Sequence, residues 1–445
     1  MAKQVLQYLR EVCNIDFSKC RGQSYDNAAN MSGCYKGMQK KILEENEFAI
    51  YIPCAAHSLN LVGRSAVDSF LEAVNFFHTV QLIYTFSSVS TNRYKIMKGC
   101  LVNKTLVKSL SNTRWEAHAV ATEAILKSHP QILKALECIQ EDQSQKRDTR
   151  REAENIVKKM QELEFAFMLD FWKEVLQHFH RVSQALQKEH VNLKMCADLY
   201  SSLVDHLHKS RNEIERFEEA AKIMIPGVDY KSTLTRNCKR KTVFIGGDAP
   251  EVSLNARDKF RISAFYAIVD KLETEMSSRG QVYNDVADRF SCLVDGSLSQ
   301  TSQCCEELIN AYPKDLNNNL YTELQQFHSY IRHKFPAASK SENNTFNHGE
   351  LYQVIVRDNI ECAFPNVEIA IRIFSTLIAN NCSTERSFSQ LKRTKNPNRS
   401  AMKQEKLNSL SLLMIEADML RKINFDDILK DFARCKSRKK TSKCK

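Results

Sequence analysis

Long apolar runs are missing from this chain of 445 residues. No segment reaches the roughly 18 consecutive apolar residues that a membrane-spanning helix needs. The opening residues, MAKQVLQYLREVC, carry charges too early and too often for the apolar centre of a secretory signal. The sequence therefore predicts a protein without a membrane partner that stays on the cytosolic or nuclear side.

Cysteine pairs at the C-x-x-C spacing of metal sites are also lacking. The 15 cysteines are scattered along the chain, and Cys304 and Cys305 are direct neighbours rather than the ends of a C-x-x-C pair. Without a secretory signal such residues are expected to be reduced thiols. Cys54 and His57 form a C-x-x-H, which is half of a zinc site and has no second pair at suitable spacing. We expect these two residues to have a structural role, in packing or hydrogen bonding.

Positive charge is what the sequence has in excess. The formal net charge is +11, which favours a polyanionic partner such as DNA, although basic proteins also exist for reasons of solubility. Residues 434–445 concentrate lysine and arginine and form a basic tail, which favours a nuclear protein. Residues 231–250 form a second basic segment, either a solvated linker or a loop that contacts phosphate.

The pattern of apolar residues indicates a mainly helical protein with a small α/β part. The apolar run at residues 49–53 is of strand type, and helical patterns precede it at about 34–45 and follow it at 55–70. This spacing predicts a parallel pair of strands, with Asp26 at or just after the end of the first one. From Leu71 onward almost every segment has helical periodicity.

Residues 380–422 combine a cluster of basic residues, Lys392, Arg393 and Lys395, with a stripe of apolar residues. Glu385 falls in the first turn of a helix in which Phe388 and Leu391 should face inward, and turn residues 396–398 end this helix. A second helix repeats apolar residues every three or four positions: Leu407, Leu410, Leu413, Met414, Ala417 and Leu420. On pattern alone this is a helical hairpin buried against its own domain.

Four segments in this order carry a resemblance: FPNVEIAIRIF, STERSFSQLKR, RSAMKQEKLNSLSLLMIE and NFDDILKDFA. The region from Phe364 to Arg438 that contains them resembles the C-terminal dimerisation region of hAT-superfamily transposases and of proteins derived from them. The resemblance implies a homodimer that forms through the apolar stripe of the second helix.

A second resemblance lies near the N-terminus. The segments RGQSYDNAANMSG and AIYIPCAAHSLNL are similar to the part of hAT transposases that holds the second catalytic aspartate. The resemblance implies an RNase H-like core in which Asp26 is the second acid and Glu385 the third, and in which three carboxylates hold Mg²⁺ or Mn²⁺. The only acids before Asp26 are Glu11 and Asp16, in a helical pattern and a connector, and neither resembles the first acid. We therefore expect a vestigial pair that binds metal weakly and needs no cofactor.

The step Arg114-Trp115 resembles the one at the entrance to the helical insertion of hAT transposases. There the Trp stacks on an extruded base and the Arg contacts phosphate, which implies DNA contacts here. A lone Trp at the start of a helix is otherwise more often a core anchor. Further DNA contacts are expected from the basic residues Arg386, Lys392 and Arg393.

Together these patterns predict a partial RNase H-like core interrupted by a large all-helical insertion. The expected domains are 1–120 for the first part of the core, 121–350 for the insertion, 351–433 for the dimerisation region and 434–445 for the tail. The expected function is that of a transposase-derived, nuclear, dimer-forming protein with DNA affinity and little or no transposase activity. Two alternatives stay open: a helical protein-interaction scaffold with no role on DNA, and a metal-dependent nuclease whose missing acid is supplied elsewhere. No small-molecule substrate is expected.

Overall fold

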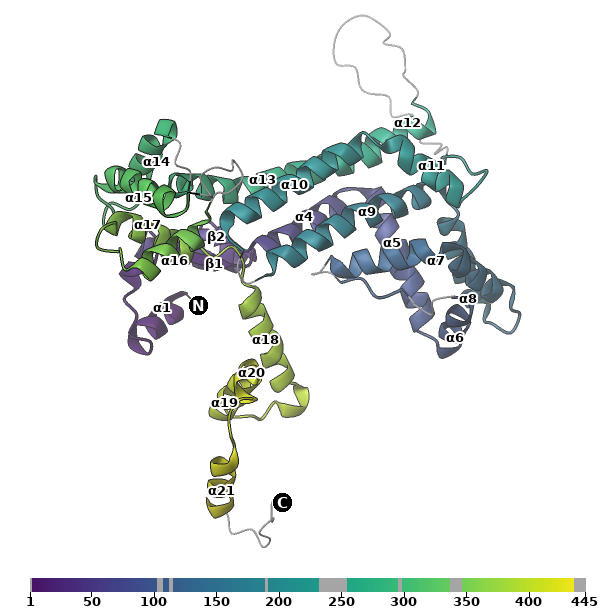
Figure 1. Cartoon of the computed structure of the whole chain (residues 1–445). Helices are drawn as coiled ribbons and strands as arrows, with labels where there is room; N and C mark the ends of the chain where they lie inside the picture. The colour runs from purple at the N-terminus through teal and green to yellow at the C-terminus, as the bar shows by residue number, and fades with distance from the viewer. Residues whose placement is uncertain are drawn as a thin grey trace, which may run out of the picture. The chain divides into compact units, whose positions relative to one another are not determined.

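The computed structural model describes residues 2–101, 107–111, 115–188, 191–231, 254–294, 298–336 and 346–435. Over these residues the chain is mainly α-helical with one two-stranded parallel sheet, which confirms the predicted fold class of mainly α with a small α/β part (Figure 1). The chain divides into two compact units, residues 1–380 and 381–445. The predicted domain limits at 120, 350 and 433 stay predictions. No helix in the described ranges is long and apolar enough to cross a membrane.

The sheet pairs β1 (Gly22–Tyr25) with β2 (Ile50–Pro53), so that Gly22 lies opposite Ile50 and Tyr25 opposite Pro53. The crossover between them contains the short α2 (Ala29–Ser32) and α3 (Met38–Glu45). A small core joins this crossover to α1 (Ala2–Glu11) and to a 3-10 turn at Phe17–Lys19. It consists of Leu6, Phe17, Met38, Ile42 and Ala49.

After the sheet the chain continues as α4 (Ala55–Ser69), α5 (Leu71–Ser88), α6 (Thr91–Cys100), α7 (Glu116–Glu141), α8 (Arg147–Met160) and α9 (Leu163–Leu186). Helix α7 is bent at Ser128, where φ/ψ is not helical, because Pro130 cannot donate the backbone hydrogen bond of a regular helix. Helix α9 carries the centre of the core, in which Phe167, Phe171 and Trp172 are fully buried.

Two long helices then run side by side. Helix α10 (Leu193–Arg211) packs along α13 (Ala267–Arg289), and α13 also packs on α4 (Figure 1). Between them in sequence lie α11 (Ile214–Met224), α12 (Ala256–Phe260) and a π-helical segment, Arg261–Tyr266, that leads directly into α13. Residues 232–253, which contain most of the predicted basic linker, lie outside the described residues.

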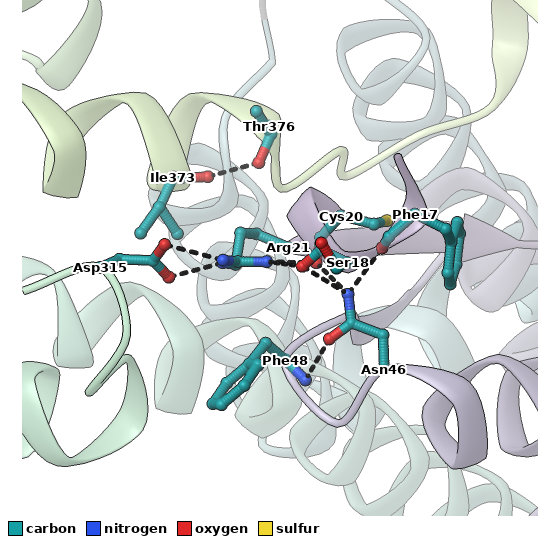
Figure 2. A network of polar contacts seen from close by, with 9 residues as sticks. All are labelled: Phe17, Ser18, Cys20, Arg21, Asn46, Phe48, Asp315, Ile373 and Thr376. Carbon is teal, nitrogen blue, oxygen red and sulfur yellow. Dashed lines mark hydrogen bonds and ion pairs between the residues drawn. The ribbon is translucent and has the colours of Figure 1, made fainter. Parts of the chain in front are cut away.

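The first unit ends with four helices. They are α14 (Leu298–Ala311), α15 (Leu320–Lys334), α16 (His348–Asp358) and α17 (Pro365–Thr376), and a 3-10 turn at Ser291–Leu293 precedes them. Figure 2 shows how Arg21, just before β1, reaches the connection between α14 and α15 and pairs with Asp315. The same guanidinium donates to the carbonyl oxygens of Ser18 and Cys20, so its donors are used on two segments of the chain.

The second unit consists of α18 (Cys382–Thr394), α19 (Gln404–Ile415), α20 (Ala417–Leu420) and α21 (Asp426–Cys435), with a 3-10 turn at Pro397–Arg399. Helices α18 and α19 pack together, and the Thr394 hydroxyl donates to the Met414 sulfur at 2.8 Å. The expectation that Phe388 faces inward is wrong, since its side chain is 65% exposed. The physical reason is that two short helices bury only one seam between them, and Phe388 lies off that seam, whereas Leu391 is half-buried.

Candidate acidic site and dimerisation surface

Asp26 lies directly after β1, at the carboxyl end of the sheet. Its side chain is exposed, and its Oδ1 accepts a hydrogen bond from the backbone N–H of Ala28 at 3.2 Å. The neighbouring backbone is tied to the end of β2, because the N–H of Cys54 donates to the carbonyl oxygen of Tyr25 at 3.0 Å. Asp26 therefore occupies the edge of the sheet at which open α/β sheets place their ligands.

Two tyrosines flank this edge. The rings of Tyr25 and Tyr51 stack across the strands with centroids 6.1 Å apart. Burial raises the pKa of each hydroxyl to about 12, and for Tyr51 the nearby charge of Asp26 adds to the shift. Both hydroxyls are therefore neutral at pH 7 and supply no charge of their own to a cation at Asp26.

A buried polar network joins the end of β2 and the start of α4 to the two long helices, α10 and α13. The Tyr283 hydroxyl of α13 lies 3.1 Å from the carbonyl oxygen of Pro53 and 3.3 Å from the hydroxyl of Ser58, which also accepts from the Asn27 amide at 2.8 Å. The Tyr200 hydroxyl of α10 donates to the carbonyl oxygen of Ala55 at 2.8 Å. Sequence analysis missed both tyrosines, because their partners lie 230 and 145 positions away and leave no local signal.

The end of the first unit is fixed at the same edge. The carbonyl oxygen of Ala379 accepts from the N–H of Ala55 at 2.9 Å. The Asn380 side-chain amide donates to the carbonyl oxygens of Leu186 and Lys188 at the end of α9. The last residues before the second unit are thus bound to the junction between β2 and α4.

Cys54 and His57 lie at the start of α4. Cys54 is completely buried at the N-cap position, and His57 is half-buried. Across the residues that the structure describes, no group of three or more His, Cys, Asp and Glu side chains could hold a metal ion. The structural role of Cys54 and His57 stays a prediction.

Glu385 lies in the first turn of α18, in the second unit, and is exposed. Arg386, Lys392 and Arg393 on the same helix are exposed as well. Asp26 and Glu385 belong to different units. That they share a cation therefore stays a prediction.

Trp115 lies inside the core rather than on a surface. Its ring stacks on His118 at 4.1 Å between centroids and meets Phe77 edge-on at 5.6 Å. A Cβ atom on Gly63 of α4 would lie only 2.7 Å from the indole, so the glycine is required for this close approach. The side chain of Trp115 is 9% exposed, and this burial favours the core alternative, while the predicted DNA contact stays a prediction. Arg114 lies outside the described residues.

The predicted stripe of α19 and α20 is only partly covered within its own unit. Leu407 is buried, Leu410, Ala417 and Leu420 are half-buried, and Leu413 and Met414 are exposed. Three more apolar side chains that were not predicted are exposed on the same helices: Leu412, Ile415 and Met419. Exposed apolar patches of this kind mark interaction surfaces in soluble proteins.

Helix α21 adds a second exposed apolar face. Phe425, just before α21, and Ile428, Leu429 and Phe432 within it recur at the spacing of one helix face, and each is at least 41% exposed. The sequence contained this signal, since the residues follow an i, i+3, i+4, i+7 pattern, but the predicted stripe stopped at Leu420.

A comparison with known families bears on the exposed residues of α19 and α20. Residues 328–419 match the family model described as the hAT family C-terminal dimerisation region. The matched residues run from the second half of α15 to α20 and contain the exposed apolar side chains of α19. Residues 328–419 are therefore similar to the hAT family C-terminal dimerisation region, which supports a dimer-forming protein related to the hAT-superfamily transposases.

Proposed function

We propose that this protein is a transposase-derived DNA-binding dimer with little or no transposase activity, acting in the nucleus. The observation that carries the proposal is the exposed apolar surface of α19 and α20 inside the matched dimerisation region. Leu412 and Met419 are 62% and 64% exposed in the single chain. Because burial of apolar surface contributes about 25 cal/mol per Å², covering such side chains with a second copy favours association.

The DNA part of the proposal is supported by the basic segment, residues 386–406. It contains seven lysines and arginines and a single acid, Glu405, and all seven cationic side chains are exposed. Within the described residues, none of Lys392, Arg393 and Lys395 forms an ion pair. Such charges can neutralise phosphates and release counterions, and a dimer presents the segment twice.

Low catalytic activity is part of the proposal because only Asp26 and Glu385 are candidates for the acidic site. The carboxylate of Asp26 is exposed in the first unit, and Glu385 belongs to the second. Metal-dependent phosphoryl chemistry needs several carboxylates that converge on the ions. If the site works after all, Mg²⁺ or Mn²⁺ is the expected cofactor.

The oligomeric state tests the dimer. We expect the intact protein to be a dimer by size-exclusion chromatography with light scattering, and the double variant Leu412→Glu, Leu413→Glu to be a monomer with unchanged helical content. Leu71→Glu is the matched control, because Leu71 is 69% exposed but lies in the first unit. A monomeric intact protein, or a double variant that stays dimeric, contradicts the proposal.

Salt-dependent binding to duplex DNA tests the second part. Each phosphate contact contributes about 0.9 to the slope of log K against log salt, so replacing Lys392, Arg393 and Lys395 with Ala should lower the slope by up to about 3. The charge-matched control replaces Lys127, Lys158 and Lys194, which are exposed on the first unit. Binding that is absent, or equally weak in both variants, favours the alternative of a protein-interaction scaffold without a role on DNA.

Strand cleavage tests the third part. We expect no cleavage of duplex DNA with Mg²⁺ or Mn²⁺ present. Metal-dependent cleavage that disappears in both Asp26→Asn and Glu385→Gln would establish the nuclease alternative, with a further acid supplied elsewhere.

A further inference from the structure

The turn between α2 and α3 places a tyrosine ring in solvent. Tyr35 is 85% exposed, the largest fraction among the exposed large apolar and aromatic side chains of the described ranges. Its neighbours Cys34 and Lys36 are exposed as well. In the part of the chain that the structure describes, no other aromatic ring stacks on Tyr35 and no cation lies over it. The ring is therefore available to a partner.

Two glycines hold this turn in one shape. The N–H of Gly37 donates to the carbonyl oxygen of Gly33 at 3.0 Å and closes the turn. A Cβ atom on Gly33 would lie 2.4 Å from the carbonyl oxygen of Ala29, and one on Gly37 would lie 2.4 Å from the N and O atoms of Gly33. Only glycine therefore fits at either position. The turn leads directly into α3, whose Met38 belongs to the small core, so the backbone that carries Tyr35 is fixed on this side.

The surroundings of the exposed ring are positively charged. Residues 17–43 contain one acid, Asp26, against five basic residues: Lys19, Arg21, Lys36, Lys40 and Lys41. Lys36 in the turn and Lys40 in the first turn of α3 are exposed, and neither forms an ion pair within the described ranges. An aromatic ring beside free cations is the combination that binds single-stranded nucleic acids, because the ring stacks on a base while the cations contact phosphates.

The turn lies at the same end of the sheet as Asp26. Because β1 and β2 are parallel, α3 must return the chain from the carboxyl end of β1 to the start of β2. The residues that precede α3 are therefore near the carboxyl end. Only α2, with four residues and a length of about 6 Å, separates the connection after Asp26 from the turn. Open α/β sheets bind their ligands at this edge.

We propose that the turn Gly33–Gly37 binds an unpaired base of single-stranded DNA, with Tyr35 stacked on the base and Lys36 and Lys40 on the flanking phosphates. This inference rests on the proposed affinity for DNA and adds a contact surface in the first unit. In a duplex both faces of a base are covered by its neighbours, so the ring can stack only where the strand is unpaired. The turn thus favours single-stranded over duplex DNA.

Binding of a labelled oligothymidylate to the full chain tests the stacking. Losing one stack between a base and an aromatic ring weakens binding by about 5- to 150-fold, which we expect for Tyr35→Ala. Tyr35→Phe keeps the ring and should bind like the intact protein. Tyr8→Ala is the matched control, because Tyr8 is also an exposed tyrosine of the first unit, at 57%. Duplex binding should be the same in Tyr35→Ala and in the intact protein.

A tryptophan in place of the tyrosine reports the stack directly. In Tyr35→Trp we expect oligothymidylate to quench the fluorescence of the added indole, because a stacked base quenches it. The control Tyr8→Trp should show no such quenching.

The dependence on salt tests the two lysines. Each phosphate contact of a single strand contributes about 0.7 to the slope of log K against log salt, so the double variant Lys36→Ala, Lys40→Ala should lower the slope by up to about 1.4. The control replaces Lys127 and Lys158, which are 65% and 66% exposed on α7 and α8.

The outcomes separate this inference from the proposal on which it rests. If the intact protein binds duplex DNA but Tyr35→Ala leaves oligothymidylate binding unchanged, the role of the turn is overturned and the affinity for DNA stands. Failure to bind oligothymidylate at all also overturns it, and favours a protein partner for the exposed ring. Binding to neither form of DNA would overturn both.

Discussion

Arg21 and Asp315 are 294 positions apart in the chain and bind each other through two parallel hydrogen bonds, Nε to Oδ2 at 2.6 Å and Nη2 to Oδ1 at 2.7 Å (Figure 2). Their side chains are 11% and 21% exposed, so water screens the pair only weakly. Such a two-pronged pair requires a planar guanidinium, which lysine cannot replace. The pair fixes the entry to β1 against the connection between α14 and α15.

Replacing Arg21 with Lys should therefore destabilise the first unit by about 2 kcal/mol, because the fork and the bonds to two backbone carbonyls are lost. Urea denaturation followed by circular dichroism measures the change. The control is Arg10→Lys, since Arg10 pairs with Glu45 at 55% and 47% exposure, where a pair contributes at most about 1 kcal/mol. Equal losses in the free energy of unfolding for the two substitutions would show that the Arg21–Asp315 pair stabilises the first unit no more than an exposed ion pair does.

Gly63→Ala should force the Trp115 ring out of its position. The added Cβ would lie 2.7 Å from the indole, and overpacking of a filled core costs about 1–3 kcal/mol. We expect a lower denaturation midpoint and a red shift of tryptophan fluorescence, to which only Trp115 and Trp172 contribute. Gly99→Ala is the control, because no atom lies within 4 Å of its added Cβ, and it should be neutral or stabilising.

The stacked pair of His178 and His206, with ring centroids 3.6 Å apart, should make stability depend on pH. Burial lowers the pKa of His178 from 6.5 to about 4, and the neighbouring His206 contributes to that shift; burial also lowers the pKa of His206. The unfolded chain therefore binds more protons between about pH 4 and 6.5. The contribution of the neutral His178–His206 pair to the free energy of unfolding is complete above pH 6.5. It is lost as the pH falls towards 4.

Urea midpoints at several pH values between 4.5 and 7.5 measure this dependence. The double variant His178→Gln, His206→Gln should show a flatter pH profile than the intact protein. His208→Gln should not, because the His208 side chain is 72% exposed. Parallel profiles for the intact protein and the double variant would exclude the pair as the source.

Tyr200→Phe should destabilise the junction between α10 and α4 by about 1–2 kcal/mol. The hydroxyl is completely buried, and its removal leaves the carbonyl oxygen of Ala55 without that donor. Denaturation of Tyr200→Phe, compared with Tyr8→Phe at an exposed position, measures the effect. A cost no larger than that of the Tyr8 substitution would mean that the hydrogen bond contributes nothing net.

The sequence predicted those helices and strands whose own residues carry the signal. The apolar run before Cys54 became β2, the helical pattern after it became α4, and Asp26 follows β1 as expected. The helical periodicity predicted from Leu71 onward does not show that α8 ends at Met160 and α9 begins at Leu163. Neither Gln161 nor Glu162 is a helix breaker, so the change of direction has no composition signal.

The rest of the candidate site could not be predicted from the sequence, because it depends on contacts between residues that are far apart in the chain. Nothing near Tyr283 or Asp315 in the chain indicates that Tyr283 binds Pro53 or that Asp315 binds Arg21. The exposure of Phe388 could not be predicted either, because a periodic apolar residue reads the same whether it faces its own core or a second copy. Trp115 shows the opposite case, in which the core alternative left open by the sequence is the one that the packing favours.

The close contact between Gly63 and Trp115 also constrains how this protein can change over time. No side chain fits at position 63 while an indole occupies position 115, so a larger residue at one position requires a smaller residue at the other. An aligned set of relatives should therefore show the two positions varying together, although 51 residues separate them.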